Sequence, residues 1–129
     1  MKVVLGLSGG VLLVAAGVAV ADPQMLSGDD LRRTVAGRTI VLDTPVGGVP
    51  ILYQPNGGLT GKATGMPGNL MSGPREDQGR WWIAANEICQ QWNAWLDGRK
   101  YCYRMRVDGK LVHWRRSDGR TGTARIVSN

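Results

Sequence analysis

The stretch that decides the fold runs from Arg80 to Arg120 and reads RWWIAANEICQQWNAWLDGRKYCYRMRVDGKLVHWRRSDGR. It contains all five tryptophans, both cysteines, the only histidine and three Asp-Gly pairs of the 129-residue chain. Its second half alternates apolar and polar residues between Asp-Gly turns that recur about every ten residues. This pattern is typical of an antiparallel meander, so we expect a mainly β fold.

Three strands follow from this alternation, over residues 100–107, 110–116 and 121–127. The first of them divides most clearly into two faces. One face carries Tyr101, Tyr103, Met105 and Val107, and the other carries Cys102, Arg104 and Arg106.

Residues 81–96 fit two structures. Apolar side chains recur at helical spacing from Trp81 through Ile88 to Trp95, which predicts one amphipathic helix. The alternative is a hairpin with strands 80–84 and 88–92, which the aromatic and β-branched residues favour. We favour the hairpin and leave the helix open.

The two cysteines predict one disulfide bond, Cys89–Cys102, provided that the protein is exported to an oxidising compartment. A tight turn at Gly98-Arg99 would place the two residues out of register, so we expect a wider loop, about residues 93–98, or a bulge. Trp95 then sits on a projecting loop. The cysteine spacing and the single histidine do not fit a zinc site, so we expect neither metal nor cofactor.

An export signal is predicted at the N-terminus. Met1-Lys2 supplies a positive start, residues 3–20 are mostly apolar, and Ala19-Val20-Ala21 resembles a signal-peptidase site. We expect cleavage between Ala21 and Asp22, a periplasmic or secreted protein and no membrane span after cleavage. An uncleaved membrane anchor is the alternative.

Residues 22–129 are long enough for one domain. Ser27 predicts the N-cap of a helix over residues 28–36, which Gly37 ends. Strands are expected over residues 38–42, 49–54 and 59–64, the first two separated by Gly47-Gly48 and the last two by Asn56-Gly57. The expected fold is a small antiparallel sheet that forms a barrel or sandwich, with one short N-terminal helix.

Residues 65–79 are rich in glycine and proline and are expected to form an irregular loop. Met66 and Met71 would suit a copper(I) ion. Two thioethers without a further ligand are more simply explained as gap-filling side chains.

Several positions together form a wider pattern. They are Gly37-Arg38-Thr39, Asn56-Gly57, Gly79-x-Trp81, Cys89-x-x-Trp92, Cys102 and the Asp-Gly turns. This pattern resembles a family of small exported alpha-proteobacterial proteins of unknown function, although the segment 65–78 is longer here. The resemblance implies a small β domain with one disulfide, and it transfers no catalytic residue.

Aromatic rings interleaved with arginines are the functional signal in a chain of net charge +6. The candidate ligand-binding residues are Trp92, Trp95, Trp114, Arg104, Arg106, Arg115 and Arg116. They predict a non-catalytic binding module for an anionic envelope component or polymer, with at least two tryptophans exposed. The plainer alternative is that the tryptophans fill a core that lacks phenylalanine.

Two other functions remain open. One is a protein-interaction or enzyme-inhibitor module, in which the loop 65–79 or the loop 93–98 inserts into an exported partner. The other is an uncharacterised enzyme, although His113 has no evident catalytic partner in the sequence. Export argues against nucleic acid as a partner.

Overall fold

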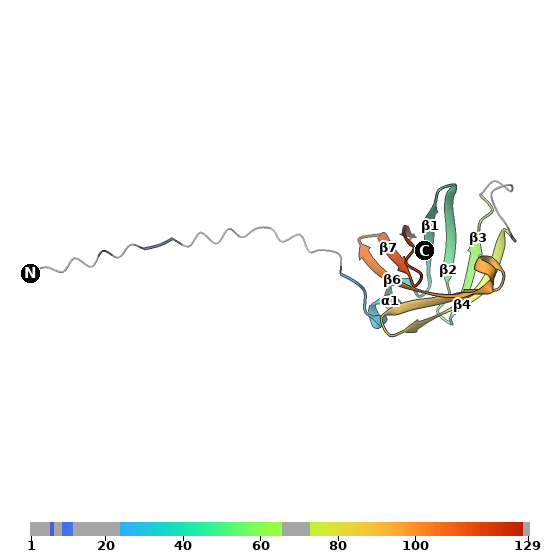
Figure 1. Cartoon of the computed structure of the whole chain (residues 1–129), viewed down its shortest axis with the longest axis horizontal. Helices are drawn as coiled ribbons and strands as arrows, with labels where there is room; N and C mark the ends of the chain where they lie inside the picture. Colours follow the sequence, from blue (N-terminus) through green and yellow to red (C-terminus); the bar gives the residue numbers. More distant parts are fainter. Residues whose placement is uncertain (1–5, 7–8, 12–23, 66–72, 128–129) are drawn as a thin grey trace, which may run out of the picture.

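Eight antiparallel strands close into a barrel, in which each strand pairs with the next along the chain and the last pairs with the first (Figure 1). This computed structural model describes residues 6, 9–11, 24–65 and 73–127. The strands are β1 (Arg38–Thr44), β2 (Gly47–Tyr53), β3 (Gly58–Lys62), β4 (Glu76–Ala84), β5 (Glu87–Trp92), β6 (Lys100–Asp108), β7 (Leu111–Arg116) and β8 (Thr121–Val127). The predicted mainly β fold is therefore confirmed as a barrel.

Side chains alternate between the barrel interior and solvent along each strand. On β6, Met105 is buried between the exposed Arg104 and Arg106, as the sequence predicts. The chain contains no phenylalanine, so large indole and phenol rings fill much of the interior. Trp81 and Trp92 are buried, and the ring of Trp81 lies 5.9 Å from that of Tyr53 in an edge-on arrangement.

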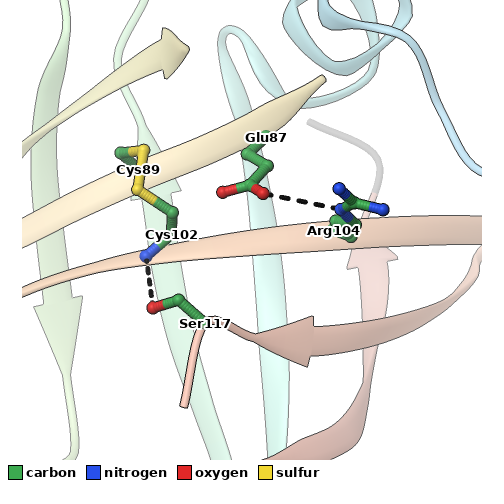
Figure 2. Close-up of a disulfide and its surroundings, with 5 residues drawn as sticks. All are labelled: Glu87, Cys89, Cys102, Arg104 and Ser117. Atoms are coloured by element: carbon green, nitrogen blue, oxygen red, sulfur yellow. Dashed lines mark hydrogen bonds and ion pairs between the residues drawn. A yellow bond between two sulfur atoms is a disulfide. The ribbon is translucent and has the colours of Figure 1, made fainter. Parts of the chain in front are cut away.

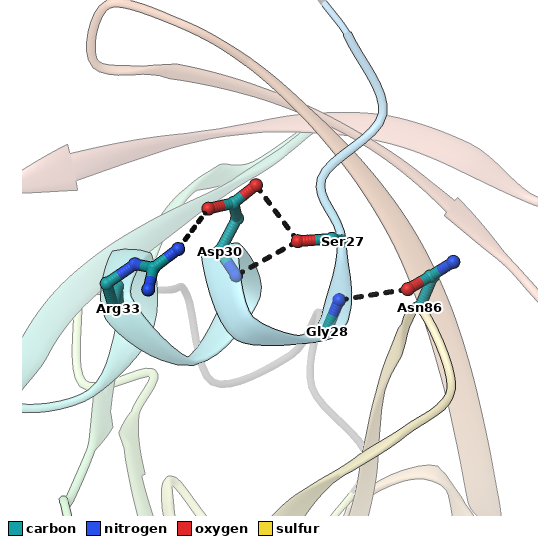
Figure 3. Close-up of polar contacts among 5 residues, drawn as sticks. All are labelled: Ser27, Gly28, Asp30, Arg33 and Asn86. Atoms are coloured by element: carbon teal, nitrogen blue, oxygen red, sulfur yellow. Dashed lines mark hydrogen bonds and ion pairs between the residues drawn. The ribbon is translucent and has the colours of Figure 1, made fainter.

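The helix α1 (Gly28–Val35) closes one end of the barrel with the fully buried side chains of Leu31 and Val35. Its predicted N-cap is confirmed: the Ser27 hydroxyl accepts a hydrogen bond from the Asp30 N–H at 3.3 Å (Figure 3). The Gly28 N–H donates to Oδ1 of Asn86 in the β4–β5 turn at 3.0 Å. This contact fixes the start of the helix against the barrel.

The hairpin interpretation of residues 81–96 is confirmed. β4 ends at Ala84, β5 begins at Glu87, and Ala85 adopts a positive φ of 53° in the turn between them. The helical spacing of the tryptophans therefore does not produce a helix, because tertiary packing of rings on a pleated wall overrides it.

The Cys89–Cys102 disulfide is confirmed and joins β5 to β6 (Figure 2). The two residues lie directly opposite each other, with their Cα atoms 4.0 Å apart. The N–H and C=O of Cys102 hydrogen-bond to Ser117 on the other side of the strand. The cysteines are therefore a non-hydrogen-bonded pair, the position where antiparallel strands approach most closely. The predicted wider loop joins the strands and contains the short helix η2 (Trp95–Gly98).

Several boundaries differ from the prediction: β1 extends to Thr44, β3 ends at Lys62 and α1 ends at Val35. Gly47 and Gly48 belong to β2, and the turn before them is Pro45-Val46. The loop predicted over residues 65–79 ends earlier, because β4 begins at Glu76 and pairs with β3. The start of β4 lacks the apolar alternation of a strand, because a polar residue, Asp77, takes an inward position there. Its carboxylate accepts hydrogen bonds from backbone N–H groups.

Some predictions fall outside the described residues. These are the signal peptide over residues 1–21, for which only 6 and 9–11 are described, and the pair Met66 and Met71 within residues 66–72. Among the described residues, the single α-helix is too short and too polar to cross a membrane.

Candidate ligand-binding cavity

The barrel interior opens into a cavity of about 750 Å³ at the end away from α1. Its mouth is formed by the β1–β2 turn, the loop that contains η2 and the β7–β8 turn. Its wall is mainly apolar and includes Leu42, Val49, Ile51, Trp92, Tyr103, Trp114 and Ala124. Small-molecule sites in proteins are concave, mainly apolar and roughly 300–1,000 Å³ in volume.

Two inward-facing glycines determine how the tryptophan rings pack along the wall. A Cβ atom at Gly122 would collide with the ring of Trp114, and one at Gly61 would collide with the rings of Trp92 and Trp95. The rings therefore lie against bare backbone on β8 and β3. This packing brings large rings close to the wall, and it leaves space in the middle of the barrel.

Trp95 belongs to one wall of this cavity and does not project from the molecule as expected. Its ring packs against that of Trp92 with centroids 4.7 Å apart and a tilt of 46° between the rings, and its Nε1–H donates to the Pro74 carbonyl at 2.6 Å. The Asp77 carboxylate accepts the N–H groups of Ala94 and Trp95, each at 2.8 Å. Burial alone would raise the pKa of Asp77, but these hydrogen bonds lower it, so the carboxylate stays charged and anchors the loop.

Arg116 is the charged side chain buried in the cavity wall. Its guanidinium is bound by both carboxylate oxygens of Asp118, at 2.8 and 2.6 Å, and lies 4.2 Å from the ring centroid of Tyr101. The hydrogen bonds from Arg116 lower the pKa of Asp118 from its ordinary 3.8 to about 2. The pair closes the β7–β8 turn and holds the guanidinium in place.

The Arg116–Asp118 pair predicts an acid-dependent loss of stability. Because the pKa of Asp118 is lower in the folded state, its contribution is complete above about pH 4 and disappears as the pH falls through about 2. We expect Asp118→Asn to lower stability at pH 6 and to flatten the decline between pH 4 and pH 2. Urea unfolding of both proteins across this range measures the effect, and an equally steep decline in the variant contradicts it.

Polar groups form the smaller part of the cavity wall. Deep in the interior, Nε2 of Gln90 donates to the hydroxyl of Tyr53, and burial raises the pKa of that tyrosine. The mouth carries both signs of charge, contributed by Asp43, Asp97, Arg116 and Arg120. Nε1 of Trp114 is buried and has no hydrogen-bond partner among the described residues. This composition suits a mainly apolar ligand with a polar end.

The seven predicted binding residues divide into two groups. Trp92, Trp95, Trp114 and Arg116 line the cavity. Arg104, Arg106 and Arg115 lie on the outer wall of β6 and β7 and do not line it. The expected pair of exposed tryptophans is not found: all five are described, two are buried and three are half-buried. Four rings pack in or against the core, whereas Trp82 is outside it and lies 5.5 Å from the Arg80 guanidinium.

Sequence reasoning missed the part of the cavity contributed by other strands. Leu42, Val49 and Ala124 come from β1, β2 and β8, and Gln90 is a polar residue of β5 whose inward direction no local pattern indicates. The alternation along β8 and the small residues Gly122 and Ala124 on one of its faces were the available signal.

Metal and catalytic sites receive no support from the described residues. The one group of potential metal ligands found there is Glu87, Cys89 and Cys102, but both sulfur atoms are in the disulfide and Glu87 pairs with Arg104 (Figure 2). His113 lies on the outer wall and makes no side-chain hydrogen bond with any described residue.

Comparison with known proteins identifies no relative: no family model, no curated protein and no solved structure matches the chain. The resemblance to small exported bacterial proteins stays a prediction.

Proposed function

We propose that this protein is an exported, non-catalytic binding module that holds a small, mainly apolar molecule inside its barrel. The observation that carries the proposal is the open cavity of about 750 Å³ with a mainly apolar wall. Burial of apolar ligand surface contributes roughly 25 cal/mol per Å². The ligand's polar end would lie at the mouth, near Arg116 and Arg120.

The disulfide supports the proposal that the protein is exported. Such bonds persist in oxidising compartments, so Cys89–Cys102 fits a periplasmic or secreted protein with a cleaved signal peptide. Export remains part of the proposal. The inhibitor alternative draws no support from Trp95, because its ring packs against the barrel.

The proposal is tested by filling the cavity. Leu42 is half-buried and faces inward near the mouth, whereas its neighbour Val41 faces outward on the same strand. N-phenyl-1-naphthylamine, a neutral apolar dye, should bind the oxidised protein with saturation at one dye per chain. We expect Leu42→Trp to weaken this binding at least about tenfold, and Val41→Trp to change it less than about twofold.

Near-ultraviolet circular dichroism shows whether both variants keep the native packing. If both variants bind the dye equally well while folded, or if the wild-type protein shows no saturable binding, the interior is not a ligand site.

A further inference from the structure

The outer wall of the barrel carries a second feature, separate from the cavity. The strand register places Arg104 opposite Arg115 and Arg106 opposite His113 on the outer surface of β6 and β7. On β8, Thr121 lies beside Arg115, and Thr123 lies beside His113. We call these six residues the cationic face.

Like charges directly opposite each other on neighbouring strands destabilise a sheet. Arg104 and Arg115 are such a pair. Arg104 pairs with Glu87 at 3.5 Å, and its side chain remains 63% exposed. Arg106 and Arg115 make no ion pair with any described residue. The face therefore carries two guanidinium groups, those of Arg106 and Arg115, that no described carboxylate pairs with. The carboxylates at its edges are Glu87 beside Arg104 and Asp43 beside Thr123.

The surface at this face is hollowed. A depression of about 630 Å³ is bounded by the cationic face together with Met25, Trp114 and Gly122. Guanidinium groups bind phosphate through two parallel hydrogen bonds, and the Thr121 hydroxyl and the His113 imidazole add further donors. The Thr123 hydroxyl donates to the Asp43 carboxylate at 2.8 Å. A concave surface with opposed arginines suits an anion with several acceptor oxygens.

We propose that the cationic face binds the phosphate groups of a linear anionic polymer. Its two rows of donors lie two residues apart along the strands, about 7 Å. A chain that carries successive phosphates meets both rows. A membrane surface fits less well, because charged lipid-binding surfaces also present apolar side chains. Of the exposed large apolar side chains described, Met25 alone borders the depression.

The test uses the oxidised protein and linear polyphosphate, with binding measured by calorimetry at low and physiological salt. We expect Arg106→Gln together with Arg115→Gln to weaken binding at least about tenfold. The matched control, Arg38→Gln together with Lys62→Gln, removes the same charge from exposed positions on β1 and β3. It should weaken binding less than about twofold, because salt screens distant charges.

Stability gives a second readout that a merely structural role for these arginines would not produce. Arg115→Gln removes the repulsion with Arg104, so we expect a higher midpoint of thermal unfolding together with weaker binding. A lower midpoint would mean that Arg115 is needed for the fold, and it would contradict the proposal.

Three results overturn the proposed polymer. The first is absence of polyphosphate binding at low salt. The second is equal weakening by both double variants, which reduces the effect to net charge. The third is binding to phosphatidylglycerol vesicles without binding to polyphosphate, which assigns the face to a membrane. Inorganic phosphate alone should bind much more weakly than the polymer, because it reaches fewer donors at once.

Discussion

Removal of the disulfide by Cys89→Ala and Cys102→Ser is expected to lower the free energy of unfolding by about 3 kcal/mol. The bond joins residues 13 apart in the sequence and so closes a loop of about 14 residues, which the chain-entropy account values at that amount. The pairing of β5 with β6 extends over only four residue pairs, from Ile88↔Tyr103 to Gln91↔Lys100. The bond therefore reinforces the short pairing of β5 with β6 in the barrel wall.

The same variant should weaken binding of the apolar dye, because β5 and β6 supply Gln90, Trp92 and Tyr103 to the cavity wall. Urea unfolding of the oxidised protein, the reduced protein and the double variant measures the stability effect. A reducing agent should not affect the double variant, which controls for other effects of the reagent. A decrease of less than about 1 kcal/mol in the free energy of unfolding would show that hydrogen bonding and packing alone hold β5 against β6.

Local chemistry explains why much of the fold was predictable. Ser27 and Gly37 mark the helix, the Asp-Gly pairs mark the turns after β6 and β7, and alternation on β6 assigns its two faces. These signals depend on neighbours in the sequence. Closure of the barrel depends on the pairing of β1 with β8, between residues more than 80 positions apart, and no local pattern specifies it.

The site was predictable only in part for a related reason. Tryptophans and arginines stand out in the sequence. Which side of the barrel wall each one occupies depends on whether its position along the strand is odd or even. Trp114 and Arg116 face inward, while Arg115 between them faces outward. The predicted single surface is therefore two surfaces, one on each side of the same wall. The cavity itself arises because rings pack against Gly61 and Gly122 across strands, which requires knowledge of strand neighbours.

Leu31→Ala is expected to lower the free energy of unfolding by about 2–5 kcal/mol. Leu31 has no exposed surface and lies in the core cluster at the end of the barrel that α1 covers. An eight-residue helix has little stability alone, so its attachment depends on Leu31, Val35 and the contact between Gly28 and Asn86. Loss of the leucine leaves a cavity beneath the helix that a close-packed interior fills only partly.

Arg33→Ala is the matched control, because Arg33 lies on the exposed face of the same helix and its one ion-pair partner among the described residues is the exposed Asp30. It should cost less than about 1 kcal/mol, the range for surface ion pairs. Urea unfolding followed by tryptophan fluorescence measures both variants. Equal losses would mean that α1 is held by its surface contacts. A large loss for Leu31→Ala alone means that packing of α1 closes this end of the barrel, which leaves the opposite end, lined by Arg116 and Arg120, as the opening for the proposed ligand.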